Sequence, residues 1–205
     1  MGSPNLRQSI LNRRMLICIF TGFASGMPLY VLISLVPAWL RTEGVGLKEI
    51  GLFSLIGLPY VWKFLWSPLL DRYSIPLLLY RPGLRRSWML STQLLLLITI
   101  AMLGFLDPPS HLWYIAWLCL GIAFLSATQD IVLDAYRRQI LPDQELGLGN
   151  SIHVNAYRIA GLVPGALSLI LSDFLPWNIV FVVTSAFVLV GLILTLSISE
   201  PTSKH

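Results

Sequence analysis

Residues 126–138 read Ser126-Ala-Thr-Gln-Asp-Ile-Val-Leu-Asp-Ala-Tyr-Arg-Arg138, and they extend a charge-free run that begins at Leu112. A run of about 20 apolar residues is long enough to cross a bilayer as a helix. Asp130 and Asp134 are four residues apart, so on a helix they share one face and lie roughly 6 Å apart along its axis. A carboxylate at membrane depth is costly unless it faces protein or water, and both are therefore candidate functional residues.

The composition is that of a bilayer protein. Of the 205 residues, 56% are hydrophobic and 12% are charged, with a mean hydropathy of +0.74, whereas about a quarter of a soluble domain is charged. The net charge is +4, but the basic residues lie in short segments between apolar runs, as membrane topology requires. This pattern argues against nucleic acid as a partner. Cys18 and Cys119 lie within apolar runs and are predicted to be small buried hydrophobes.

Six apolar runs predict one all-α membrane domain, a six-transmembrane-helix bundle over residues 15–199. The predicted spans are approximately 15–40, 47–70, 87–106, 112–138, 146–172 and 174–199, between a cytoplasmic segment 1–14 and a cytoplasmic tail 200–205. A signal peptide is the alternative for the first run, although that run continues well past the small residues at 24–26. Gly22 and Gly26 have the spacing that lets another helix approach closely. Pro28 and Pro37 are expected to kink the first helix.

The basic residues predict that both termini are cytoplasmic. With this orientation ten basic residues lie inside, namely Arg7, Arg13, Arg14, Arg72, Arg81, Arg85, Arg86, Arg137, Arg138 and Lys204. Only Arg41 and Lys48 lie outside the membrane on the other side. Such an excess follows the positive-inside rule, and an even number of spans returns the C-terminus to the cytoplasm.

Four charged residues remain at membrane depth: Lys63, Asp130, Asp134 and Arg158. Two are positive and two negative, so they neutralise one another if their helices meet. Counting 1.5 Å per residue places Lys63 level with Asp130 and Arg158 near the midplane. Asp134 lies nearer the cytoplasm, where Arg137 and Arg138 follow one turn later. The alternative is that these charges only fix helix packing, or that Lys63 extends to the inner surface.

Polar neighbours of these charges predict a hydrated cavity for a polyhydroxylated or amide-rich ligand. They are Gln129, Asn155, Tyr157 and Tyr60. His153 is expected to form an interhelical hydrogen bond rather than to relay protons. The tryptophans are expected mainly at the membrane interfaces, with Trp62 or Trp66 as an alternative cavity residue. No nucleophile accompanies the carboxylates, and no phosphate loop or His/Cys ligand spacing occurs, so we expect no enzyme, cofactor or metal.

The predicted topology resembles the N-terminal half of a major facilitator fold. The loop signature of that superfamily is degenerate here: Ser67 replaces the glycine, Asp71-Arg72 match, and Gly83-Leu84-Arg85-Arg86 comes late. A closer resemblance is to the AmpG-type muropeptide permeases, which are related to acetyl-CoA transporters. It is carried by residues 22–28, 50–55, 60–73 and 126–136, by Leu141-Pro142, and by Asn155-Ala-Tyr-Arg158.

The resemblance implies a proton-coupled secondary transporter that imports anhydromuropeptides (GlcNAc–anhydroMurNAc with or without peptide). Import would cross the bacterial inner membrane and serve peptidoglycan recycling. Asp130 and Asp134 then become candidates for proton coupling or substrate contact, with Asp130 favoured for coupling. Arg158 and Lys63 become their partners or bind a substrate carboxylate. The implied cytoplasmic gate consists of Asp71, Arg72, Arg85, Arg86, Arg137 and Arg138.

The superfamily builds its site between two six-helix halves. The expected partners are therefore the lipid bilayer, protons, the glycopeptide substrate and a C-terminal six-helix half or a second copy of the chain. Two alternatives stay open. One is a non-transporting half-permease or interaction subunit, and the other is a transporter of acetyl-CoA or another anionic metabolite.

Overall fold

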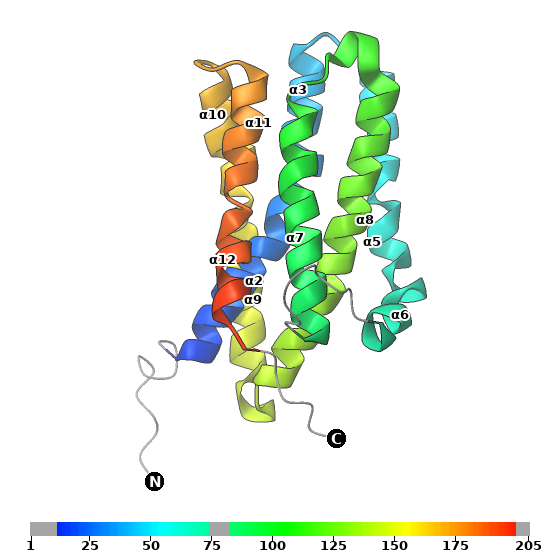
Figure 1. Cartoon of the computed structure of the whole chain (residues 1–205). Helices are drawn as coiled ribbons and strands as arrows, with labels where there is room; N and C mark the ends of the chain where they lie inside the picture. The colour runs from blue at the N-terminus through cyan, green and yellow to red at the C-terminus, as the bar shows by residue number, and fades with distance from the viewer. Residues whose placement is uncertain (1–11, 74–82, 200–205) are drawn as a thin grey trace.

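The described residues of the computed structural model, 12–73 and 83–199, form an upright bundle of helices (Figure 1). Residues 1–11 of the predicted segment 1–14, the predicted tail 200–205, and residues 74–82 with the loop residue Arg81 lie outside the described residues. Five helical stretches are long and apolar enough to cross a membrane, and the search covered only the described part of the chain. They are Arg13–Thr42, Leu84–Leu103, Pro108–Ile140, Asp143–Ser172 and Trp177–Ser197.

The first stretch consists of α2 (Arg13–Tyr30), a π-helical turn (Val31–Leu35) and α3 (Val36–Thr42). Pro28 lies inside α2 just before the π turn, and Pro37 lies at the start of α3. A proline removes one backbone donor, and the wider π turn accommodates the interrupted hydrogen-bond ladder. The irregularities of this helix thus lie beside its two prolines.

The segment 47–72 is a chain of short helices instead of one continuous helix. It contains α4 (Leu47–Leu52), α5 (Leu58–Trp62) and α6 (Ser67–Arg72), joined by two 3-10 turns. Pro59 and Pro68 stand at the starts of α5 and α6, where the missing N–H is tolerated. The second predicted span, and with it the count of six and the orientation of the termini, therefore stays a prediction.

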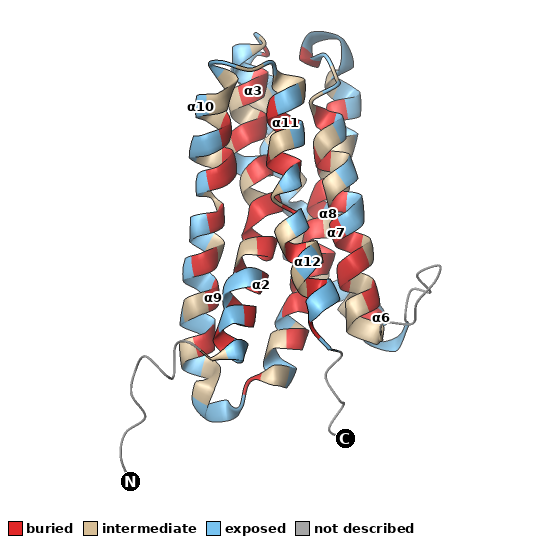
Figure 2. Cartoon of the chain, turned by 60° about the vertical axis from the view of Figure 1, so that its left-hand side comes forward, coloured by how far each residue is buried: buried red, intermediate tan, exposed pale blue. Residues whose placement is uncertain are grey.

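The remaining helices complete the bundle. They are α7 (Leu84–Leu103), α8 (Pro108–Ile140), α9 (Leu146–Ala160), α10 (Ser168–Ser172), α11 (Trp177–Ala186) and α12 (Leu189–Ser197). A π-helical turn at Val163–Leu167 joins α9 to α10 and packs against the π turn of the first stretch. α2 packs on α9, α8 and α12, while α7 packs on α8, α11 and α12. Buried residues face these contacts and exposed ones cover the outer faces (Figure 2).

Gly22 and Gly26 lie where α2 meets α9, as their spacing predicts. A methyl group added at Gly22 would collide with the backbone carbonyl of His153, and one at Gly26 with that of Tyr157. The two glycines and the two carbonyls are each one helical turn apart, so the backbones touch at successive turns. This close contact sets the spacing of the two helices that carry most of the site.

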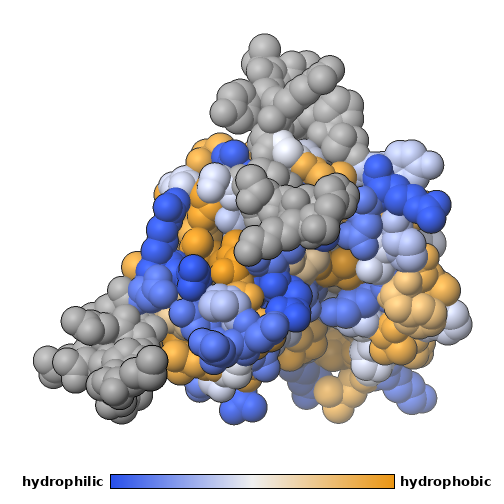
Figure 3. All heavy atoms as spheres, turned by 90° about the horizontal axis from the view of Figure 1, so that it is seen from below, coloured by the Kyte–Doolittle hydropathy of each residue, from blue (hydrophilic) through white to orange (hydrophobic). Residues whose placement is uncertain are grey.

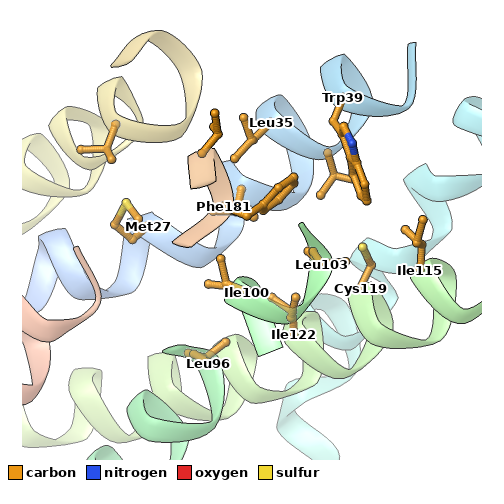
Figure 4. Close-up of a cluster of buried hydrophobic side chains, with 14 of the residues drawn as sticks. Met27, Leu35, Trp39, Leu96, Ile100, Leu103, Ile115, Cys119, Ile122 and Phe181 are labelled. Atoms are coloured by element: carbon orange, nitrogen blue, oxygen red, sulfur yellow. The ribbon is translucent and has the colours of Figure 1, made fainter. Parts of the chain in front are cut away.

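The main apolar cluster lies between α2, α3, α7, α8 and α11 (Figure 4). It buries Trp39, which is only 1% exposed and meets the ring of Phe181 edge-on at 4.9 Å between centroids. The prediction of an interfacial anchor is therefore wrong for Trp39, because α11 covers that end of α3. Trp113 and Trp117, by contrast, are 79% and 67% exposed on α8. Cys119 is buried in this cluster and Cys18 in a smaller one, both as free thiols.

Candidate functional site

A cavity of about 440 Å³ lies between α2, α8 and α9. Its lining combines hydroxyl, amide, imidazole and charged groups: Ser25, Tyr30, Asp130, Asp134, Arg137, Asn150, His153, Val154, Tyr157 and Arg158. Helical spacing explains the α8 contribution, because positions 130, 134 and 137 fall on one face. The α9 contribution follows the same rule at 150, 153, 154, 157 and 158.

Asp130 is the deeply buried carboxylate of this cavity, with 9% of its surface exposed. Its Oδ1 accepts a hydrogen bond from the Ser25 hydroxyl at 2.5 Å. The preceding residue, Gln129, donates its amide to the carbonyl of Ala24 at 2.9 Å. Consecutive residues of α8 are thus attached to consecutive residues of α2. A buried carboxylate held by one neutral hydroxyl is a group whose protonation changes its bonding.

Asp134 lies one turn nearer the end of α8 and forms an ion pair with Arg137 at 2.9 Å. Arg138 contacts Asp143 at 3.0 Å instead. Asp134 is therefore neutralised within its own helix, by one of the two arginines that follow it.

The expected ion pairs between Asp130 and the basic residues at membrane depth do not form. Among the described residues, neither Lys63 nor Arg158 lies within ion-pair distance of a carboxylate. Lys63 belongs to the broken segment 47–72, in a 3-10 turn that packs on α8, and it does not line the cavity. Arg158 does line the cavity, where its charge is available to a ligand.

The structure separates the predicted polar residues into two groups. Tyr157 lines the cavity, whereas Gln129, Asn155 and Tyr60 do not. Gln129 faces α2, and Asn155 is exposed and donates to the Ser151 carbonyl of its own helix at 2.8 Å. The hydroxyl of Tyr60 is buried. Counting the rise per residue along one helix places such residues at the depth of the charges, but it does not say which way each side chain points.

Ser25, Tyr30 and Asn150 line the cavity and were not predicted as site residues. Ser25 precedes Gly26, one of the two glycines whose spacing predicts a close contact with another helix. That position next to Gly26 was the only sign in the sequence that Ser25 would lie near the site. His153 is buried, and its Nδ1 lies 3.4 Å from the Thr21 hydroxyl of α2, the interhelical contact expected of it. No group of three His, Cys, Asp or Glu side chains in the described ranges could hold a metal ion.

Residues predicted as a gate gather at the end of the bundle that carries α6 and the α8–α9 junction, where hydrophilic side chains are concentrated (Figure 3). Arg85 contacts Asp71 and Gln139, each at 3.2 Å, and so connects α6, α7 and α8. Arg86 donates to the carbonyls of Thr195 and Leu196 near the end of α12. The exposed Arg72 has no ion pair within the described residues.

Replacing Arg85 with glutamine is expected to release α6 from the bundle end. Asp71 is more than half exposed, so the loss is about 1 kcal/mol, equivalent to roughly fivefold faster local opening. Hydrogen–deuterium exchange of residues 67–72 would measure it. Arg72→Gln is the matched control and should leave exchange unchanged, whereas equal acceleration in both variants would refute the connection by Arg85.

The chain belongs to the Major Facilitator Superfamily, whose family model matches residues 18–205. This superfamily is a family of transporters. The chain is 46% identical to the anhydromuropeptide permease of Escherichia coli strain K12 over 190 residues, 92% of this chain and 38% of that protein. It is 52% identical to an uncharacterized protein of Haemophilus influenzae over 198 residues, 97% of this chain and 46% of that protein.

The chain thus spans less than half the length of either relative. Its apolar helices and its bacterial permease relatives make it a multi-pass protein of the bacterial inner membrane. The resemblance to AmpG-type permeases noted from the sequence is confirmed.

Proposed function

We propose that the chain forms one wall of a proton-coupled permease that imports anhydromuropeptides across the inner membrane for peptidoglycan recycling. The observation that carries the proposal is Asp130, a buried carboxylate on a cavity that also contains Arg137 and Arg158. The name of the E. coli relative, anhydromuropeptide permease, supports the choice of substrate.

Transport needs a second wall. Superfamily transporters bind their substrate between two halves that rock about a central site. The cavity described here lies on a single helical unit, with Asp134 and Arg158 exposed at its mouth. The second wall is a C-terminal six-helix half or a second copy of the chain. The proton enters on Asp130, and its arrival weakens the interaction with Ser25 and shifts the balance between inward and outward states.

Uptake of radiolabelled GlcNAc–anhydroMurNAc tests this function. Cells lacking their own permease would express the chain alone, the C-terminal half of the E. coli relative alone, or both together. Accumulation is expected with both halves, or with the chain alone if it pairs with itself, and an uncoupler should abolish it. No accumulation despite both halves being present in the membrane would favour the non-transporting subunit. Competition by unlabelled acetyl-CoA, without competition by unlabelled disaccharide, would show that the transported substrate is acetyl-CoA or a related anion instead of the muropeptide.

A further inference from the structure

A second cavity, of about 350 Å³, continues the first toward the hydrophilic end of the bundle. It is lined by Asp134, Arg137, Arg138, Leu141, Leu146, Gly147 and Asn150. Three residues, Asp134, Arg137 and Asn150, line both cavities. The two spaces therefore follow one another between α8 and α9, and the Asp134–Arg137 ion pair lies where they meet.

Arg137 uses only part of its hydrogen-bonding capacity at this junction. Its Nη2 donates to Asp134 at 2.9 Å, while its Nη1 is buried and has no partner in the part of the chain that the structure describes. The guanidinium is a planar fork of donors that matches the two oxygens of a carboxylate. A buried donor on a charged group is costly when it is unpaired. An anionic group that enters the passage from a ligand could pair with this donor once the atoms that cover Nη1 move aside.

We infer that Arg137 is the carboxylate-binding residue of this passage, and that its ligand carries one carboxylate on an otherwise polar body. This inference rests on the proposed function, because the passage begins at the proposed transport site. It moves Arg137 from the gate to direct ligand contact. The lactyl carboxylate of GlcNAc–anhydroMurNAc, or a carboxylate of its peptide, has the required chemistry.

The charges of the lining support a single carboxylate. Across the two cavities, Asp130 and Asp134 balance Arg137 and Arg158, and Arg138 is paired with Asp143 at 3.0 Å, with His153 and the tyrosines Tyr30 and Tyr157 counted as neutral. A bound monoanion leaves one uncompensated negative charge beside the buried Asp130, and a charge is costly where it is buried. One proton on Asp130 restores neutrality. Ligand and proton should therefore favour each other's binding.

Asp134 acts as an internal competitor for Arg137. About half of its side chain is exposed, whereas Arg137 is 15% exposed, so the aspartate can swing into the cavity while the guanidinium stays in place. Removing the charge of Asp134 should release Arg137 for the ligand. Substitutions at the two positions are therefore expected to have opposite effects on carboxylate affinity.

Binding to the chain reconstituted in lipid nanodiscs together with the C-terminal half of the E. coli relative, followed by isothermal titration calorimetry, tests the inference without transport. The probes are GlcNAc–anhydroMurNAc, its neutral methyl ester, and the acidic dipeptide acetyl-Ala-Ala, which carries one carboxylate. The native chain should bind the acid about tenfold or more tightly than the ester, the effect of a hydrogen bond to a charged group. Arg137→Gln should remove that preference, and Asp134→Asn should increase it.

Arg14→Gln is the matched control. It removes one arginine at the same end of the bundle, where Arg14 contacts Glu145 outside both cavities, and it should leave the preference unchanged. Arg137→Lys keeps the charge but loses the fork, and a partial loss of preference is expected there even if the glutamine variant unfolds.

Equal binding of acid and ester by the native chain, or an unchanged preference in Arg137→Gln, would overturn the inference and leave the proposed substrate standing. Arg137-dependent binding of the acidic dipeptide, with no binding of either disaccharide, would support a carboxylate site and remove the muropeptide assignment. Failure to bind any of the three probes would overturn both.

Discussion

Asparagine in place of Asp130 is expected to abolish uncoupler-sensitive uptake while the bundle stays folded. The amide has nearly the shape of the carboxyl group, and its oxygen can still accept the hydrogen bond from Ser25, so the contact between α2 and α8 is kept. What the variant loses is the ability to bind and release a proton. If the proton coupling passes through this residue, accumulation against a gradient must fall to the level of cells without the permease.

Uptake of labelled disaccharide with both halves expressed is the measurement, and the same cells can be tested for exchange of preloaded substrate. Exchange should persist in Asp130→Asn if only coupling is lost. Asp173→Asn, at the end of α10, makes the same chemical change away from the cavity and should behave as the native chain. Undiminished accumulation by Asp130→Asn would remove this carboxylate from the mechanism.

The packing-only interpretation of the buried charges makes a different prediction. If Asp130 and Arg158 only stabilised each other, neutralising both would restore stability lost in either single variant. The two residues line one cavity but are not an ion pair. No such rescue is therefore expected, and additive changes in unfolding free energy should be measured instead.

Five of the six predicted apolar runs contain a helix long and apolar enough to cross a membrane among the described residues, because the bilayer itself dictates their length and lack of charge. Of the residues predicted for substrate or proton contact, Asp130, Asp134, Tyr157 and Arg158 line the cavity, and so does Arg137, which was predicted for the gate. Lys63 does not, because its segment breaks into short helices at Pro59 and Pro68, and a depth count assumes one straight helix. The roles of these residues in transport stay predictions.

The direction in which each side chain points is what the sequence leaves open. Gln129 and Asp130 are neighbours in the sequence. The Gln129 amide donates to a backbone carbonyl of α2, whereas the Asp130 side chain lines the cavity. Trp39 lies near the end of a predicted span, where tryptophan is typical of an interface, but α11 covers it. Both outcomes depend on which helix packs alongside, and helix neighbours are not encoded in the periodicity of a single span.

The contact between α2 and α9 should be the most sensitive part of the fold, and alanine at Gly26 tests it. The added methyl group would meet the backbone carbonyl of Tyr157 and come within 3.1 Å of the Ala160 side chain. A backbone carbonyl cannot rotate away, so the helices must separate, at a cost of about 1–3 kcal/mol for overpacking. Thermal unfolding in detergent, followed by circular dichroism, should show the loss.

Gly121→Ala is the matched control for this prediction, because a methyl group added there has no other atom within 4 Å. Alanine is the better helix former by about 1 kcal/mol, so the control should be unchanged or slightly more stable. Equal destabilisation of both variants would contradict the close-contact argument.

The effect of Gly26→Ala should also reach the site. Ser25 lies next to Gly26 and donates to Asp130, so separating α2 from α9 shifts the hydroxyl that holds the buried carboxylate. Gly26→Ala should therefore lower uptake more than its loss of stability alone accounts for, since the same helix sets both the packing and the position of the proton-binding group.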